Sequence, residues 1–195
     1  RCICVVKVTA SNGEYGWGEG YGPANVLEAG IELLKPIVIG LDPLENEVIW
    51  NQMYRKTLDF ARRGTLVASM SAIDIAIWDL KGKILGLPVS TLLGGAHRTE
   101  VRPYATGLYF TSHDNPSQEF DEEAQIYISQ GFKAIKMKIG LGVEEDYKNV
   151  KRMRDLIGDD IQLMVDSNHA YNFREAIQLA KKLEPLNISW FEEPL

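Results

Sequence analysis

The hydrophobic pattern of the first hundred residues changes from strand-like to helical. Apolar residues flank an Asn12-Gly13 pair in "RCICVVKVTASNGEYGWGEG", which predicts two antiparallel strands joined by a turn. The glycines of "GWGEG" are interpreted as turn residues, because they do not lie between a strand and a helix as a phosphate-binding loop does. Apolar residues then recur at spacings of three and four, which predicts two amphipathic helices. They are Leu27, Ile31, Leu34 and Val38, then Val67, Met70, Ile73, Ile77, Leu80 and Ile84. We expect residues 1–97 to form a capping α+β domain.

The second hundred residues alternate between strand-like and helical segments. The strand-like stretches are "VRPYATG", "KAIKMKIG", "IQLMVDSN" and "ISWFEEP". Their centres lie roughly 30 residues apart, which is the size of a βαβ unit. Asn172 and Glu175 have the spacing of a capping box at the start of one intervening helix. This order predicts an α/β domain over residues 98–195 with a parallel sheet, either a doubly wound layer or about half of an eight-stranded barrel.

Composition narrows the class of protein. The chain has 195 residues, of which 45% are hydrophobic and 25% charged, and its net charge is -6. No basic stripe stands out, so we expect no nucleic-acid partner. No apolar run approaches the roughly 18 residues that span a bilayer, so we expect no membrane segment. We also expect a cytoplasmic homo-oligomer with a small-molecule carboxylate as its substrate.

Three of the predicted strands end in polar side chains, where the functional groups of parallel βα folds gather. They are Lys136 and Lys138, then Asp166 and Asn168, then Glu192 and Glu193. Strand alternation allows Lys138, Asp166 and Glu192 to face a common point. The carboxylates of Asp166 and Glu192 suit Mg²⁺. A set of structural ion pairs is the alternative, but buried ion pairs are costly and stabilise little, which favours function. Glu193 is expected on the opposite face, towards the helices.

Lys136 and Lys138 lie two residues apart, so on a strand they share a face at about 6.6 Å. Repulsion of two ammonium groups at that distance is about 2.5 kcal/mol at an effective dielectric near 20. Repulsion and partial burial therefore predict that the pKa of one lysine falls to about 7 to 8, where it can act as a general base. Such a base beside Mg²⁺ could remove the α-proton of a carboxylate, since the cation offsets the developing charge.

Other polar residues of this half are weaker candidates for contact with a substrate. His169 follows the polar end of the third strand and could contact substrate or cap a loop. Tyr104 and Tyr109 flank the end of the first strand, with packing as the alternative to substrate contact. His97 and His113 are interpreted as loop histidines.

These motifs in order resemble the mandelate racemase and muconate lactonizing enzyme family of the enolase superfamily. The similarity is carried by K-x-K, D-x-N and E-E-P and by "ASMSAIDIAIWDLKGKILGLPVSTLLGG", and it covers nearly the whole chain. It implies an α+β capping domain followed by the first half of a modified TIM (β/α)7β barrel. "YATG", "KMKIGLGVEED", "VDSNHAYN" and "WFEEP" are similar to sugar-acid members such as galactarolactone cycloisomerase and acid-sugar dehydratases.

The resemblance also implies roles, position by position. Lys138 matches the catalytic base and Lys136 its partner, while Asp166 and Glu192 match ligands of Mg²⁺. The residue at Asn168 matches one beside metal and substrate, and Arg63 lies where an arginine could meet an anionic substrate. A third carboxylate ligand and a second acid/base group are expected beyond Leu195.

The expected function is Mg²⁺-dependent removal of the α-proton of a sugar acid or its lactone through an enediolate. The outcome would be dehydration, cycloisomerisation or racemisation. Two alternatives stay open: an aldolase that uses a barrel lysine in a Schiff base, and a sugar-acid binding protein without catalysis.

Overall fold

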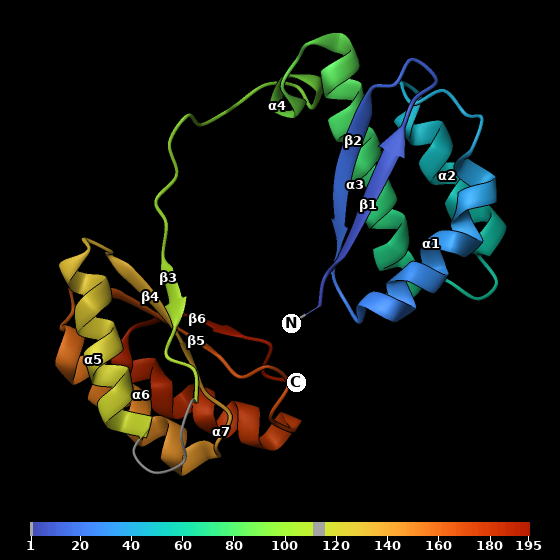
Figure 1. The fold of residues 1–195 in the computed structure, drawn as a ribbon. Helices are drawn as coiled ribbons and strands as arrows, with labels where there is room; N and C mark the ends of the chain where they lie inside the picture. Colours follow the sequence, from blue (N-terminus) through green and yellow to red (C-terminus); the bar gives the residue numbers. More distant parts are fainter. Residues whose placement is uncertain (1, 111–115) are drawn as a thin grey trace. The chain divides into compact units, whose positions relative to one another are not determined.

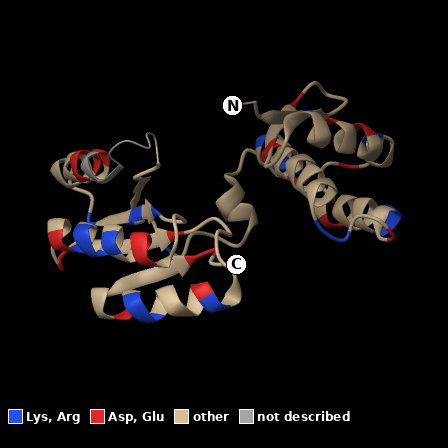
Figure 2. Cartoon of the chain, turned by 90° about the horizontal axis from the view of Figure 1, so that it is seen from below, with Lys and Arg blue, Asp and Glu red and all other residues tan. Residues whose placement is uncertain are grey.

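The computed structural model describes residues 2–110 and 116–195. It divides into two compact units, Arg1–Thr99 and Glu100–Leu195. The expected domain boundary, between residues 97 and 98, lies close to this division. Figure 2 shows acidic and basic residues interspersed on the helices of both units.

The N-terminal unit packs a β-hairpin against helices (Figure 1). Its strands are β1 (Cys4–Thr9) and β2 (Tyr15–Gly20), which pair antiparallel as the sequence predicts. Its helices are α1 (Ala24–Val38), α2 (Asn46–Thr57), α3 (Thr65–Leu85) and α4 (Val89–Leu92). The long helix α3 ends at Gly86, whose left-handed φ of 65° suits glycine.

The glycines of "GWGEG" do not serve the turn, so that interpretation was wrong. They alternate onto the buried face of β2, which packs on α3. A Cβ atom on Gly16 would lie 2.0 Å from the carbonyl oxygen of Ala76, and one on Gly18 2.0 Å from that of Ala72. These glycines allow the backbones of strand and helix to approach closely.

The C-terminal unit is a parallel sheet with the strand order β3-β4-β5-β6 and helices between the strands (Figure 1). The strands are β3 (Ala105–Gly107), β4 (Ala134–Lys138), β5 (Gln162–Asp166) and β6 (Ile188–Glu192). The helices are α5 (Pro116–Ser129), α6 (Val143–Ile157), α7 (Phe173–Leu183) and the short 3₁₀ helix η1 (Glu184–Leu186). The capping box of Asn172 and Glu175 forms at the start of α7, as predicted.

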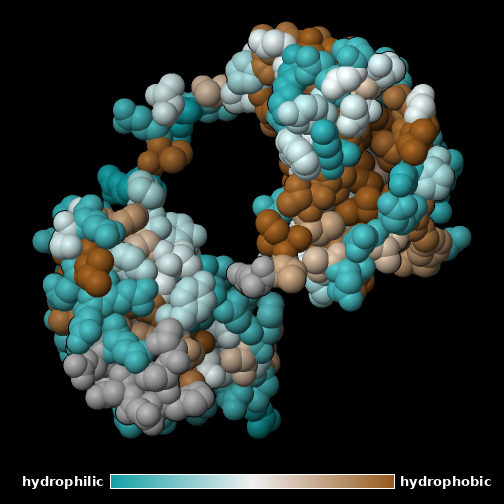
Figure 3. All heavy atoms as spheres, viewed as in Figure 1, coloured by the Kyte–Doolittle hydropathy of each residue, from teal (hydrophilic) through white to brown (hydrophobic). Residues whose placement is uncertain are grey.

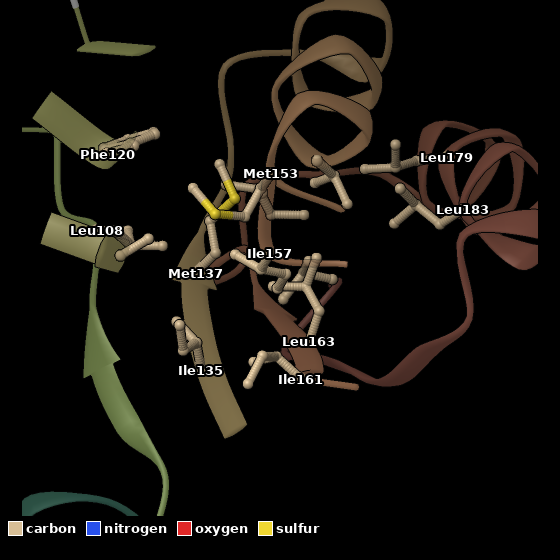
Figure 4. Packing of buried hydrophobic residues seen from close by; sticks show 14 of the residues in the cluster. Leu108, Phe120, Ile135, Met137, Met153, Ile157, Ile161, Leu163, Leu179 and Leu183 are labelled. Carbon is tan, nitrogen blue, oxygen red and sulfur yellow. The ribbon is translucent and has the colours of Figure 1, made fainter. Parts of the chain in front are cut away.

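One face of this sheet forms the core with the helices, and the other carries the polar residues. Ile135 and Met137 of β4 and Leu163 of β5 are fully buried in a cluster with side chains of α5, α6 and α7 (Figure 4). Because strand side chains alternate, Lys136 and Lys138 point to the opposite face, as expected.

Candidate active site

Strand register brings three charged residues into line at the carboxyl ends of the sheet. Lys138 of β4 pairs with Asp166 of β5, and Asp166 pairs with Glu192 of β6. Hydrogen bonding along parallel strands thus places the last residue of each of the three strands side by side. The predicted convergence of these positions is observed.

The side chains form a connected set of ion pairs. Nζ of Lys136 lies 3.1 Å from Oδ2 of Asp166 and 2.9 Å from Oε2 of Glu192. Nζ of Lys138 lies 2.7 Å from the same Oδ2 of Asp166. The exposed side-chain fractions are 2% for Asp166 and 10% and 13% for the two lysines, whereas Glu192 is 35% exposed. Asp166 is therefore a buried anion held between two ammonium groups.

This arrangement changes the expected electrostatics of the lysine pair. Burial alone would lower the pKa of Lys136, but its hydrogen bonds to Glu192 and Asp166 outweigh burial and raise that pKa above its ordinary value. The sequence predicted a lowered pKa for one lysine of the pair, and Lys136 is not that lysine. The repulsion argument counted two ammonium groups on one strand and omitted the carboxylates that the neighbouring strands place beside them.

The pKa of Asp166 is shifted in the opposite direction to that of Lys136. Burial would raise the pKa of its carboxyl group, but hydrogen bonds from Lys138, Lys136 and the backbone N–H of Asn168 lower it overall. The Asp166 carboxylate is thus held in the ionised form that a metal ligand requires.

Asn168 contacts this set of ion pairs through both its side chain and its backbone. Nζ of Lys138 donates to its Oδ1 at 2.5 Å, and its backbone N–H donates to Oδ1 of Asp166 at 3.1 Å. The residue has a positive φ of 43°, a conformation that asparagine adopts more readily than most residues. Asn168 therefore contacts both Lys138 and Asp166, and its role beside metal and substrate stays a prediction.

Tyr109 approaches the site from the end of β3. Nζ of Lys138 lies 5.4 Å from the centre of its ring, a cation–π contact, and the ring is half exposed. The preceding residue, Leu108, has a φ of 55°, and its N–H donates to Oε2 of Glu123 at 2.9 Å. Tyr104 instead packs edge-on against Trp190, with ring centroids 5.4 Å apart.

His169 lies at the edge of this set rather than within it. Its Nδ1 is 2.7 Å from the carbonyl oxygen of Leu195, and its Nε2 is 3.5 Å from Oε2 of Glu193. The side chain is 64% exposed, so a role in substrate binding stays a prediction.

Arg63 belongs to the N-terminal unit, where it is exposed before α3, and its role also stays a prediction. His97 is exposed in a connecting segment, and His113 lies outside the described residues.

Glu193 is the polar residue that the sequence placed wrongly. It was expected among the helices, but its Oε2 accepts a hydrogen bond from Nδ2 of Asn168 at 2.9 Å. Its φ of 45° turns the chain out of the strand conformation directly after β6, so the alternation of faces no longer applies. An adjacent pair of glutamates before Pro194 marks the end of the strand but does not reveal this turn.

A cavity of about 1150 Å³ lies elsewhere, in the N-terminal unit. Figure 3 shows the hydrophobic surface of that unit in brown. The lining is largely apolar, with Val6, Ile73 and Ile77 among its residues, and it includes none of the predicted site residues. The cavity therefore does not compete with the polar strand ends as a place for acid–base chemistry.

Asp166 and Glu192 fit a magnesium ion by the chemistry of their donor atoms. One cationic group, Nζ of Lys136, already contacts both carboxylates, so they face a common point. Magnesium in proteins is usually held by one or two carboxylates, with water and substrate completing its shell. Within the described residues, no group of three or more His, Cys, Asp or Glu side chains is arranged around a metal position. The residues present thus fit an ion held by two carboxylates.

None of the helices in the described part of the chain is long and apolar enough to cross a membrane.

Two family models match successive parts of the chain. The mandelate racemase / muconate lactonizing enzyme N-terminal domain matches residues 1–94, and the enolase C-terminal domain-like family matches residues 119–195. Together they cover most of both structural units.

Relatives with assigned activities are about twice as long as this chain. D-galactarolactone cycloisomerase of Agrobacterium fabrum is 41% identical over 100% of the chain, and the match covers 52% of that protein. Arabinonate dehydratase of Saccharolobus solfataricus is 40% identical over 99% of the chain, again covering 52% of the relative. The chain spans about half the length of the curated relatives it matches.

Solved structures agree with the fold described above. The crystal structure of the 3,6-anhydro-D-galactonate cycloisomerase from Zobellia galactanivorans matches 100% of this chain and 54% of its own, with a TM-score of 0.93 and 54% identity. A racemase from Streptomyces coelicolor A3(2) with bound magnesium matches 97% of this chain and 57% of its own, with a TM-score of 0.87 and 32% identity. The predicted fold class is confirmed: an N-terminal α+β unit followed by the first half of the family's barrel. The chain belongs to the mandelate racemase/muconate lactonizing enzyme family of the enolase superfamily.

Proposed function

We propose that this chain supplies the base and two metal ligands of a Mg²⁺-dependent enzyme that removes the α-proton of a sugar acid or its lactone. One observation carries the proposal: Lys138 shares the carboxylate of Asp166 with Lys136, which also contacts Glu192, at the common end of three parallel strands. Family membership and the relatives named as sugar-acid enzymes support the same class of reaction.

Lys138 is the proposed base. In its neutral form it accepts the α-proton on Nζ, and the electron pair of the broken C–H bond moves into the carboxylate to give an enediolate. The ammonium group that forms is stabilised by Asp166 and by Oδ1 of Asn168, which lie 2.7 Å and 2.5 Å from Nζ. Both contacts strengthen as the positive charge develops, so they favour the transition state over the ground state.

Lys136 serves as the second cation of the site. Its raised pKa keeps it protonated at neutral pH, so it can attract the carboxylate of the substrate and balance the negative charge of the enediolate. Asp166 and Glu192 would hold Mg²⁺, which when bound supplies further positive charge to the developing dianion. Only 10% of the Lys136 side chain is exposed, so little water screens its charge.

The fate of the enediolate sets the net reaction. If an oxygen substituent lies on the β-carbon, its C–O bond breaks, the oxygen leaves with the bonding electron pair, and an enol remains. A departing hydroxyl gives dehydration, and a departing ring oxygen gives ring opening. We propose β-elimination of this kind, because both the cycloisomerases and the dehydratase among the relatives act on sugar acids or their cyclic forms by name.

The proposal is tested with full-length protein, Mg²⁺ and a panel containing galactarate, arabinonate, gluconate and their lactones. Proton NMR in D₂O follows loss of the α-proton signal and formation of product. We expect exchange or elimination with at least one member of the panel, and loss of both after removal of Mg²⁺ with EDTA. Activity that survives EDTA would contradict the proposal, and a covalent adduct trapped by borohydride would instead indicate a Schiff-base enzyme. Binding without exchange would indicate a non-catalytic protein.

A further inference from the structure

The side-chain amide of Asn168 makes one contact at each end. Its Oδ1 accepts from Nζ of Lys138 at 2.5 Å, and its Nδ2 donates to Oε2 of Glu193 at 2.9 Å. A primary amide has an acceptor oxygen and a donor nitrogen. Turning it over would place the NH₂ group against an ammonium and the oxygen against a carboxylate. A donor at one end and an acceptor at the other therefore favour one orientation of the amide.

The backbone holds Glu193 in place for this contact. Its φ of 45° is unfavourable for a side chain other than glycine, asparagine or aspartate. Its carbonyl oxygen accepts from the N–H of His169 at 2.8 Å and from Oγ of Ser167 at 2.9 Å. These two bonds from the loop after β5 offset the cost of the left-handed conformation, which points the carboxylate towards Asn168 rather than towards the helices.

The contact of Glu193 with His169 is the weaker of its two side-chain contacts. The distance from Oε2 to Nε2 of His169 is 3.5 Å, and the two side chains are 44% and 64% exposed. Exposed ion pairs contribute little, whereas the amide contact at 2.9 Å is within hydrogen-bond distance. The influence of Glu193 on the site thus passes mainly through Asn168.

We propose that Glu193 is a positioning residue for α-proton abstraction, which acts by orienting the amide of Asn168 so that its oxygen faces Lys138. This inference rests on the proposed function. Glu193 makes no described contact with Lys138 or Asp166, so its removal should lower kcat much more than it changes KM. Orienting partners of this kind are commonly worth about 10- to 100-fold in activity.

Two variants separate the reach of the Glu193 side chain from its charge. Glu193→Gln keeps the length and an acceptor oxygen but removes the charge. Glu193→Asp keeps the charge but is one methylene shorter, so it should lose contact with Asn168. We expect Glu193→Gln to retain kcat within about threefold and Glu193→Asp to lose about 10- to 100-fold, with KM little changed in both. Glu145→Gln, an exposed change on α6, is the matched control.

The measurement is α-proton exchange in D₂O by the full-length Mg²⁺ enzyme, with galactarate and arabinonate as probes. The Glu193→Asp change is also made in an Asn168→Ala background, where we expect no further loss. Wild-type activity in Glu193→Asp, an equal loss in both Glu193 variants, or an undiminished loss in the Asn168→Ala background would overturn the inference.

A crystal structure of full-length Glu193→Asp supplies a readout that does not depend on activity. We expect the amide of Asn168 to have turned away, so that its contact with Nζ of Lys138 is lost. An unchanged Asn168 would overturn the inference. If wild-type enzyme exchanges no probe, the proposed function fails, and this structure still decides whether Glu193 orients Asn168.

Discussion

Lys138 and Asp166 are register partners on neighbouring parallel strands, and Nζ of the lysine lies 2.7 Å from Oδ2 of the aspartate. Both side chains are largely buried, so each has lost most of its hydration. Replacing such a pair by apolar side chains often costs nothing or stabilises a protein, which makes a purely structural purpose the weaker explanation. The proposed base, Lys138, is therefore paired with Asp166, the residue proposed to bind the metal ion.

Asp166→Asn should weaken the binding of Mg²⁺ by at least about 100-fold, because it removes one of the two carboxylates that, among the described residues, contact Nζ of Lys136 and face a common point. Isothermal titration calorimetry with MgCl₂ on the full-length protein measures the affinity. Glu192→Gln should act in the same direction, and the exposed change Glu145→Gln should leave the affinity unchanged. An affinity for Mg²⁺ that is unaltered by Asp166→Asn would show that the ion is held elsewhere.

Asp146 should give the unfolding free energy a defined pH dependence. The residue is fully buried in the first turn of α6, where it accepts hydrogen bonds from the N–H groups of Gly140 and Leu141 in the loop after β4 and from the hydroxyl of Tyr171. Burial raises its pKa despite the backbone bonds, which act in the opposite direction. The folded state therefore binds a proton on Asp146 more tightly than the unfolded state does.

The sign follows from linkage. Stability from Asp146 is fully present below its unfolded pKa of about 3.9 and is lost as the pH rises through the folded pKa. The unfolding free energy of the wild type, minus that of Asp146→Asn, should therefore decrease with rising pH across this window. Urea unfolding at a series of pH values measures the difference, and a difference that is constant or increases with pH would contradict the assignment.

Gly18→Ala should destabilise the N-terminal unit by about 3 kcal/mol or more, because its Cβ would lie 2.0 Å from the carbonyl oxygen of Ala72 on α3. Urea unfolding followed by circular dichroism provides the value. Glu19→Ala, on the exposed face of the same strand, is the matched control and should change stability by less than about 0.5 kcal/mol. Equal stability of the two variants would mean that strand and helix do not pack so closely.

The sequence predicted those parts of the fold that depend on local patterns. Alternation of side chains placed Met137 in the core and Lys138 on the opposite face, because a strand allows no other arrangement. The capping box at Asn172 was also predictable from a local pattern, because Asn172 and Glu175 lie within one helical turn.

The predictions that failed concern contacts between distant segments. The packing of Gly16 against Ala76 depends on a helix 60 residues further along the chain, which local turn chemistry does not reveal. The repulsion argument also left out Asp166 and Glu192 of other strands, whose hydrogen bonds raise the pKa of Lys136. Glu193 was misplaced because a single left-handed residue ended the alternation on which its prediction relied.

The proposed role of Lys138 is tested most directly by α-proton exchange in the Lys138→Ala variant of the full-length Mg²⁺ enzyme. The probe is whichever panel compound the wild type exchanges in D₂O, followed by proton NMR, with the exposed change Lys148→Ala as control. We predict that Lys138→Ala lowers the exchange rate at least about 1000-fold, while Lys148→Ala exchanges at the wild-type rate. Exchange by Lys138→Ala at a rate close to that of the wild type would show that another group removes the proton.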